Sequence, residues 1–353
     1  MYTRTGQEER TVIGQKIRIW REGEYAYPGA YGFVPFMVSY VHEDEEIRPG
    51  MLIVPGGAYR YASPSEAHLP AMEFYRAGYN VFVLVYTVNY LDEPLKMQPL
   101  SDIARAVRII RGHCGQCHID PDRLVVCGFS AGGHLCASLC VHHRDIHDPD
   151  ALYNEITARP DAALLCYPVI TSGEYANRES YKALLGEEPD EAELEYMSLE
   201  KQVTEDTPPC FLWQTATDTS VPVENSYLFA RACREAKVPF AHHVFSEGRH
   251  GMSVATEEWL ARDYGQPYTL EQIRLLAEAV NQGKTSLPPE AAEEILREHE
   301  LDGTKKQKWS PKEKEEIRDT MYEVTQWREL AKRWLARTLK LDRLSKVHGG
   351  EEE

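Results

Sequence analysis

The sequence around one serine is typical of a nucleophile. Ser130 is the centre of the motif Gly-Phe-Ser-Ala-Gly at residues 128–132. An apolar run, residues 124–127, precedes the motif, and a helix-like stretch, residues 133–143, follows it. Strand, sharp turn and helix with a serine at the tip make a nucleophile elbow, in which the two glycines leave room for the turn. A motif this short also occurs by chance, so a glycine-rich turn that binds a phosphate, or nothing, is the alternative.

An elbow serine needs a base and a group that orients the base, and both should follow the serine along the chain, the acid first. Asp218 is the carboxylate of the loop after an expected strand at residues 210–214. His250 lies in a glycine-containing loop after the last expected strand, residues 240–245. We therefore predict that His250 takes the serine proton and that Asp218 orients the imidazole. The alternatives are an aspartate that only caps a turn and a histidine that only lies at the surface.

The negative charge that develops during acyl transfer needs hydrogen-bond donors. The expected strand at residues 51–54 runs into the sequence Pro-Gly-Gly-Ala-Tyr at residues 55–59. We predict that this loop and the start of the elbow helix supply an oxyanion hole from the backbone amides of Gly57, Ala58 and Ala131. Tyr59 and Tyr61 follow the glycines and are candidates for substrate contact, although aromatic residues at such positions are as often packed in the core.

The elements that must position these residues alternate between apolar strands and helices. Besides the elbow strand, we expect strands at residues 16–20, 37–41, 51–54, 81–85, 162–166, 210–214 and 240–245. We expect helices at residues 65–78, 100–112, 133–143 and 224–236. Continuous apolar strands separated by helices indicate an α/β fold with a mostly parallel sheet covered on both faces.

The C-terminal part of the chain differs in composition. Residues 260–310 are polar and carry their own helix signals, including a capping-box-like sequence at residues 269–272 and a proline pair at residues 288–289. Ser-Pro-Lys-Glu at residues 310–313 is a strong helix start, and the helix that it opens is expected to run to about residue 341.

We expect one domain over residues 1–345, with residues 260–310 as a helical insertion within it. The insertion begins beside the predicted catalytic histidine, so it could cap the site or pair two subunits of a homo-oligomer; a surface excursion is the alternative. The last residues, 346–353, are expected to be disordered.

Composition limits the partners. The 353 residues carry a net charge of −17, with 42% hydrophobic and 27% charged residues, which argues against nucleic acid or an anionic membrane as a partner. Neither an apolar run of membrane-spanning length nor a hydrophobic signal core is evident, so we expect a cytoplasmic protein. Five of the eight cysteines lie in apolar stretches and are expected to be reduced thiols rather than disulfides: Cys127, Cys136, Cys140, Cys166 and Cys210.

Two clusters could suggest metal or haem. The sequence Cys-Gly-Gln-Cys-His at residues 114–118 matches a haem attachment pattern, and with His113 it could suggest zinc. A second ligand pair at regular spacing is missing, so we favour a plain helix-to-strand loop. Residues 142–148 hold three histidines and two aspartates, for which we favour a solvated helix end.

Four segments carry a family resemblance: Pro-Gly-Gly-Ala-Tyr, Gly-Phe-Ser-Ala-Gly-Gly-His-Leu, Thr-Asp-Thr-Ser-Val-Pro and Gly-Arg-His-Gly-Met. They resemble the α/β-hydrolase esterases, and most of all the acetyl-xylan-esterase-like and BD-FAE-like carbohydrate esterases. The likeness covers roughly residues 48–258 and resumes at about 322–340. Many relatives carry a histidine where this chain has Pro55, and relatives lack the insertion.

Carried over by position, the resemblance implies Ser130 as nucleophile, His250 as base and Asp218 as orienting acid. It implies the same oxyanion hole, and a reaction without metal or organic cofactor. We expect a serine esterase that deacetylates a carbohydrate, such as a xylan-type oligosaccharide, or a similar small ester. The alternatives are an arylformamidase, a peptidase-like acyl hydrolase and a non-catalytic binding protein on a hydrolase scaffold.

Overall fold

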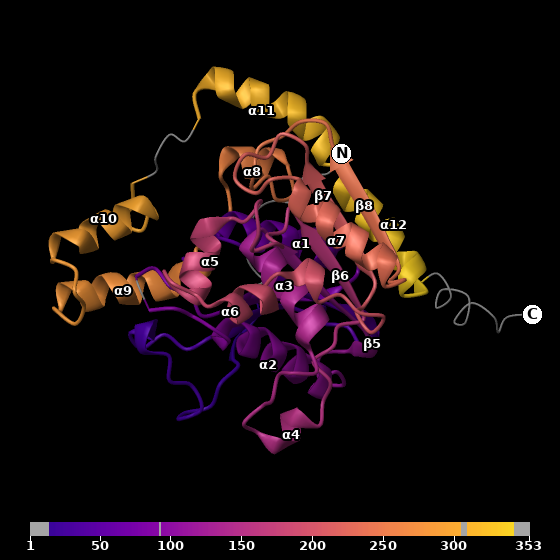
Figure 1. Ribbon diagram of the computed structural model, residues 1–353, viewed down its shortest axis with the longest axis horizontal. Helices are drawn as coiled ribbons and strands as arrows, with labels where there is room; N and C mark the ends of the chain where they lie inside the picture. Colours follow the sequence, from indigo (N-terminus) through magenta and orange to yellow (C-terminus); the bar gives the residue numbers. More distant parts are fainter. Residues whose placement is uncertain (1–13, 92, 305–308, 342–353) are drawn as a thin grey trace, which may run out of the picture.

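The computed structural model describes residues 14–91, 93–304 and 309–341 and contains an eight-stranded sheet (Figure 1). The strands lie in the order β1-β2-β4-β3-β5-β6-β7-β8. β2 runs antiparallel to both of its neighbours, and all other adjacent pairs are parallel. The strands are β1 (Lys16–Arg18), β2 (Phe36–Tyr40), β3 (Arg48–Val54), β4 (Asn80–Val85), β5 (Ile119–Phe129), β6 (Ala162–Cys166), β7 (Cys210–Thr215) and β8 (Phe240–Phe245).

Helices connect the strands and continue after the last one. Those within the sheet region are α1 (His68–Arg76), α2 (Gln98–Gly112), α3 (Ala131–His142), α4 (Ala151–Asn154), α5 (Arg178–Leu185), α6 (Glu191–Tyr196) and α7 (Glu224–Glu235). Those after β8 are α8 (Glu257–Ala261), α9 (Glu271–Asn281), α10 (Glu290–Glu298), α11 (Pro311–Val324) and α12 (Trp327–Thr338). Short 3₁₀ turns are found at Pro28–Ala30, Pro64–Glu66, Leu199–Lys201 and Tyr268–Leu270.

The sheet separates two apolar cores because successive side chains of a strand point to opposite faces. In β3, Leu52 and Val54 belong to one core, with α2, α3 and α7. Met51 and Ile53 belong to the other, with α1, α11 and α12. The mostly parallel sheet with helices on both faces is the α/β architecture that the alternating apolar runs predict.

The last helical segment is broken where one long helix was expected. The capping box of Ser310 and Glu313 is confirmed. α11 nevertheless ends at Val324, and α12 starts at Trp327. Trp327 is fully buried, stacks on Trp213 with ring centroids 5.3 Å apart and donates from Nε1 to a backbone carbonyl 2.9 Å away. The break turns the second half of the segment onto the sheet, where this indole anchors it.

The capping box expected at residues 269–272 is wrong. The N-cap of α9 is Leu270, which cannot cap with its side chain, and a 3₁₀ turn precedes it. Gln272 instead uses its amide to bind a core segment. It accepts from the N–H of Val88 at 3.0 Å and donates to the C=O of Val88 at 2.6 Å. A tertiary contact therefore fixes the start of α9.

α9 and α10 lie in the predicted insertion and form an arm at one side of the molecule (Figure 1). They share a small apolar core that also contacts Tyr61 and Tyr90. The two ends of this insertion meet, because the rings of Trp259 and Trp309 lie 5.3 Å apart.

The division into one domain with an insertion stays a prediction, and the expected tail at residues 346–353 lies outside the described residues. Within the described ranges, none of the helices combines the length and apolar character needed to cross a bilayer.

Candidate active site

Ser130 lies at a sharp turn between β5 and α3. Its φ and ψ angles are 55° and −119°, a sparsely populated conformation for a residue with a side chain. The flanking glycines are sterically required. A Cβ on Gly128 would collide with the carbonyl oxygen of Gly132, and a Cβ on Gly132 with that of Val54. Glycine is therefore required at both motif positions, because the backbones of β5, α3 and β3 come too close there to leave room for a Cβ.

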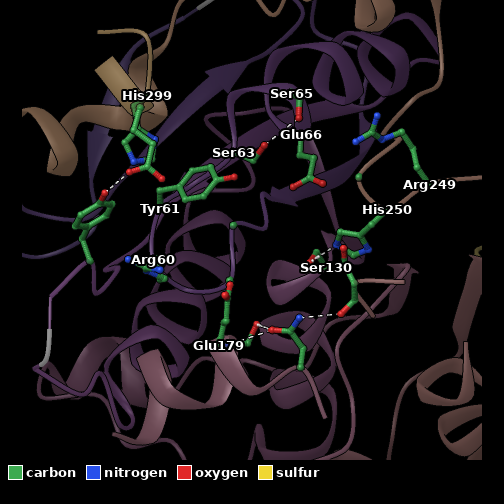
Figure 2. A pocket seen from close by; sticks show the side chains of 18 of the residues that line it. Arg60, Tyr61, Ser63, Ser65, Glu66, Ser130, Glu179, Arg249, His250 and His299 are labelled. Atoms are coloured by element: carbon green, nitrogen blue, oxygen red, sulfur yellow. Dashed lines mark hydrogen bonds between the residues drawn. The ribbon is translucent and has the colours of Figure 1, made fainter. Parts of the chain in front are cut away.

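The structure brings Ser130, His250 and Asp218 together from the loops after β5, β8 and β7. The Ser130 Oγ lies 2.8 Å from His250 Nε2 (Figure 2). Asp218 Oδ2 lies 2.6 Å from His250 Nδ1. Because a carboxylate can only accept, Nδ1 carries the hydrogen and Nε2 is left to accept the serine proton.

Asp218 is itself held in place. Its other oxygen, Oδ1, accepts from the backbone N–H groups of Ser220 at 2.9 Å and Val221 at 3.0 Å. The residue is only 7% exposed. Asp218 therefore caps the following turn through Oδ1 and binds His250 through Oδ2.

The loop after β3 borders the same cavity as Ser130 through Gly57 and Ala58. Gly57 has a φ of 121°, and a Cβ there would collide with the carbonyl oxygen of Tyr61. The carbonyl of Pro55 accepts from the hydroxyl of Tyr86 at 2.7 Å. Ala131 is the first residue of α3 and directly follows the serine, where helix amides are free of intrahelical partners.

The prediction that Tyr59 contacts substrate is wrong, because Tyr59 does not line the cavity around Ser130. Its side chain is 1% exposed and points into the core, where its hydroxyl lies 2.8 Å from His134 Nδ1. Burial lowers the pKa of His134 to about 4, so its imidazole is neutral. Nε2 donates to the carbonyl of Met197 at 3.1 Å, which leaves Nδ1 to accept from Tyr59. Tyr59 anchors the glycine loop instead of contacting substrate.

Tyr61 does line the cavity, which has a volume of about 360 Å³. Its ring meets that of His299, which follows α10, edge-on at a centroid distance of 4.9 Å. Glu298, also from the insertion, accepts a hydrogen bond from the hydroxyl of Tyr90. Figure 2 shows Ser130 and His250 at one end of this cavity and Tyr61 with His299 at the other.

Sequence reasoning missed several charged residues in the cavity wall. The guanidinium of Arg60 lies over the ring of Tyr90 at 5.1 Å, and that of Arg249 over Trp309 at 5.3 Å. The carboxylates of Glu66 and Glu179 also line the cavity. Arg249 is adjacent to His250 in sequence, so the histidine loop was a signal for it. Glu66 and Glu179 lie in segments without a recognisable motif.

The two clusters that could suggest metal have other roles. The Cys114 thiol donates to the carbonyl of Ile110 at 3.3 Å. His142 lies 2.9 Å from the carbonyl of Tyr196, and His143 lies 3.0 Å from Asp206. Among residues 14–91, 93–304 and 309–341, no three His, Cys, Asp or Glu side chains are grouped so as to hold a metal ion.

Comparison with known proteins gives a consistent set of relatives. The sequence model of the BD-FAE family matches residues 39–233. A protein of Butyrivibrio fibrisolvens named endo-1,4-beta-xylanase B is 51% identical over 255 residues, which are 72% of this chain and 40% of that protein. The acetylxylan esterase of Xylanibacter ruminicola is 27% identical over 234 residues, 62% of this chain and 44% of that protein. The chain thus spans less than half the length of these two curated relatives.

A solved structure matches a larger share of its own length. The acetyl ester-xyloside bifunctional hydrolase from Caldicellulosiruptor lactoaceticus is 38% identical, with a TM-score of 0.65. The alignment covers 71% of this chain and 94% of that one.

Proposed function

The chain belongs to the BD-FAE family and has the α/β-hydrolase fold, and from this we propose that it is a serine esterase that removes acetyl groups from carbohydrate. The observation that carries the proposal is the position of His250. Its two ring nitrogens bind the Ser130 hydroxyl and the Asp218 carboxylate at the same time, at 2.8 Å and 2.6 Å. A serine, a histidine and a carboxylate in this order of contact are the parts of an acyl-transfer site.

In the proposed reaction, Ser130 Oγ attacks the ester carbonyl while its proton passes to His250 Nε2. Asp218 stabilises the resulting imidazolium through Nδ1. The backbone amides of Gly57, Ala58 and Ala131 are assigned to the oxyanion of the tetrahedral intermediate. The imidazolium then gives its proton to the leaving alcohol, and an acetyl-enzyme remains. Water, deprotonated by His250, attacks this ester and releases acetate, which restores Ser130. The nucleophile, the base, the orienting acid and the oxyanion donors of these steps all belong to the chain.

The choice of an acetylated xylan-type oligosaccharide rests on the relatives and on the cavity. The names of the three relatives refer to xylan, xyloside or acetyl esters. The cavity wall carries arginine and glutamate side chains that suit a hydroxyl-rich alcohol. A second cavity of about 430 Å³ shares lining residues with the first, including Tyr61 and His299, and continues along the insertion. The combined space supports an alcohol of several sugar units.

A cytoplasmic location is also part of the proposal. All eight cysteines are free thiols, and seven of them are buried. Free thiols are typical of a reducing compartment. A homo-oligomer built through the insertion, and the lack of nucleic acid or membrane partners, stay predictions.

The experiment is a covalent serine probe combined with substrate assays. A fluorophosphonate should label Ser130, and acetylated xylo-oligosaccharides and p-nitrophenyl acetate should both release acetate. Ser130→Ala should lose both labelling and turnover. Wild-type turnover in Ser130→Ala would refute the mechanism, and absence of labelling in the wild type would favour a binding protein. Faster cleavage of an N-formyl arylamine or a peptide substrate than of acetyl esters would favour the other hydrolase classes.

A further inference from the structure

The glycine loop after β3 has a backbone conformation that needs support from outside the loop. Gly57, Ala58 and Tyr59 have φ angles of 121°, 54° and 60°. Residues with side chains rarely adopt this region, so such a run persists only where surrounding groups fix it. Tyr86 and His134 supply contacts from the core side. A further contact comes from the side of the cavity.

That contact is the carboxylate of Glu66, at the end of the 3₁₀ turn Pro64–Glu66. Its Oε2 accepts a hydrogen bond of 2.8 Å from the N–H of Gly56. Glu66 is only 3% exposed, yet it lines the same cavity as Ser130 (Figure 2). Gly56 lies between the two, since a Cβ on it would be 2.8 Å from Ser130 Cβ and 3.0 Å from Glu66 Oε2. The carboxylate therefore holds the residue directly before the assigned oxyanion donors.

The other oxygen of Glu66 reaches the histidine side of the site. Oε1 accepts from the hydroxyl of Tyr167 at 2.7 Å, and the same phenol oxygen accepts from the N–H of Ser253 at 3.1 Å. The ring of Tyr167 lies edge-on to the imidazole of His250, at a centroid distance of 4.9 Å. Ser253 Oγ also donates to the carbonyl of Ser65 at 2.7 Å. The turn that carries Glu66 is thus bound to the loop that carries the base.

We infer that Glu66 is a positioning residue that fixes the Gly56 peptide, and through it the amides of Gly57 and Ala58, relative to Ser130 and His250. The inference rests on the proposed esterase function. An N–H and an O–H both face this side chain, and only a carboxylate accepts from two donors without presenting a hydrogen of its own. Donors for an oxyanion act by being held in place before the charge develops. This chain has Pro55 where many relatives carry a histidine. In this chain, Glu66 binds the next residue, Gly56.

The test compares Glu66→Gln with the wild type. Glutamine keeps the size of the side chain, but its NH2 group replaces one of the two oxygens and places a donor against the N–H of Gly56 or the hydroxyl of Tyr167. With p-nitrophenyl acetate, we expect kcat to fall about 10- to 100-fold while KM stays within about twofold, because the loss is felt only in the transition state. The affinity for a trifluoromethyl ketone, whose adduct with the serine carries an oxyanion, should fall by a similar factor. Tyr167→Phe keeps the Glu66–Gly56 bond, so both quantities should fall less.

Glu73→Gln is the matched control. Glu73 is a partly buried carboxylate on α1, and it binds Arg328 and Lys332 instead of the glycine loop. Its variant should lose stability and keep both kcat and inhibitor affinity. Wild-type kcat and inhibitor affinity in folded Glu66→Gln would overturn the inference and leave the esterase proposal intact. If Glu66→Gln does not fold, Glu66→Asp decides, because it keeps a carboxylate but draws it back from Gly56 by one methylene. A fall in both quantities supports the inference, and wild-type values overturn it. Failure of the wild type to react at Ser130 would instead remove the proposed function.

Discussion

The ring of Tyr61 and the ring of His299 meet edge-on, with centroids 4.9 Å apart, although 238 positions separate the two residues along the chain. Tyr61 belongs to the loop that follows the glycines near Ser130. His299 follows α10 of the arm. The catalytic core and the arm therefore build one wall of the cavity together, and changes in the arm should alter how an extended alcohol binds.

His299→Ala should raise KM for an acetylated xylo-oligosaccharide about three- to tenfold, because it removes one face of this aromatic wall. The kcat for p-nitrophenyl acetate should stay unchanged, since that ester does not extend to the arm. Steady-state kinetics on both substrates make the comparison.

Replacing residues 262–308 by a short linker should raise the KM for the oligosaccharide further and leave the kcat for p-nitrophenyl acetate unchanged. The mass of this variant in size-exclusion chromatography would show whether the arm also pairs subunits. Equal effects on both substrates would contradict the assignment.

Asp218→Asn should lower kcat by about 10³- to 10⁴-fold, because an amide no longer fixes the hydrogen on His250 Nδ1. Hydrolysis of p-nitrophenyl acetate at saturating concentration measures the loss. The chain offers a matched control in a second aspartate–histidine pair, since Asp206 Oδ2 lies 3.0 Å from His143 Nε2, away from the cavity around Ser130. Asp206→Asn should retain wild-type kcat. A similar kcat in the two variants would contradict the role of Asp218.

Gly57→Ala should lower the free energy of unfolding by about 1–3 kcal/mol, because alanine is strained at a φ of 121° and its Cβ meets the Tyr61 carbonyl. The displaced amides should also lower kcat by at least about tenfold. Gly78→Ala separates the two effects. Gly78 has a φ of 90° with open space around its Cβ position, so its variant should lose stability and keep kcat. Urea denaturation and steady-state kinetics on each variant provide both values.

The ion pairs of Glu73 should make stability depend on pH. Burial raises the pKa of Glu73, but hydrogen bonds and charge from Lys332 and Arg328 lower it more, so it lies below the ordinary value of 4.5. A lowered carboxyl pKa adds stability above that ordinary value, and this stability is lost as the pH falls through the lowered pKa. The difference in unfolding free energy between the wild type and Glu73→Gln should be largest near pH 7 and shrink as the pH falls below the ordinary pKa of 4.5. A difference that stays constant with pH would show that packing, not charge, holds α12 to α1.

The strands and the elbow could be predicted because their signals are local. An apolar run such as residues 210–214 and the glycine spacing around Ser130 are set by neighbours in the sequence. Asp218 and His250 followed from chain order once the strands were placed. The positions of the strands and the order of the loops along the chain were therefore enough to select these two residues.

The predictions that failed depended on contacts between distant segments. Tyr59 turns into the core because three successive residues have positive φ angles, which no composition rule indicates. Gln272 binds Val88 across the fold, so α9 begins without the expected cap. The role of Glu66 has no sequence motif, because the N–H of Gly56 lies ten residues before it and the hydroxyl of Tyr167 comes from a different loop.

The contact between Trp259 and Trp309 has a consequence for how such chains diversify. The stretch of chain between them, which includes α9 and α10, begins and ends at this one contact. The free energy of closing a loop grows only slowly with its length. An exchange of this segment for a longer, shorter or unrelated one therefore leaves the registers of β7 and β8 in place. Under the proposed function, such an exchange would change the wall that faces the alcohol and keep the loops that carry Ser130, Asp218 and His250.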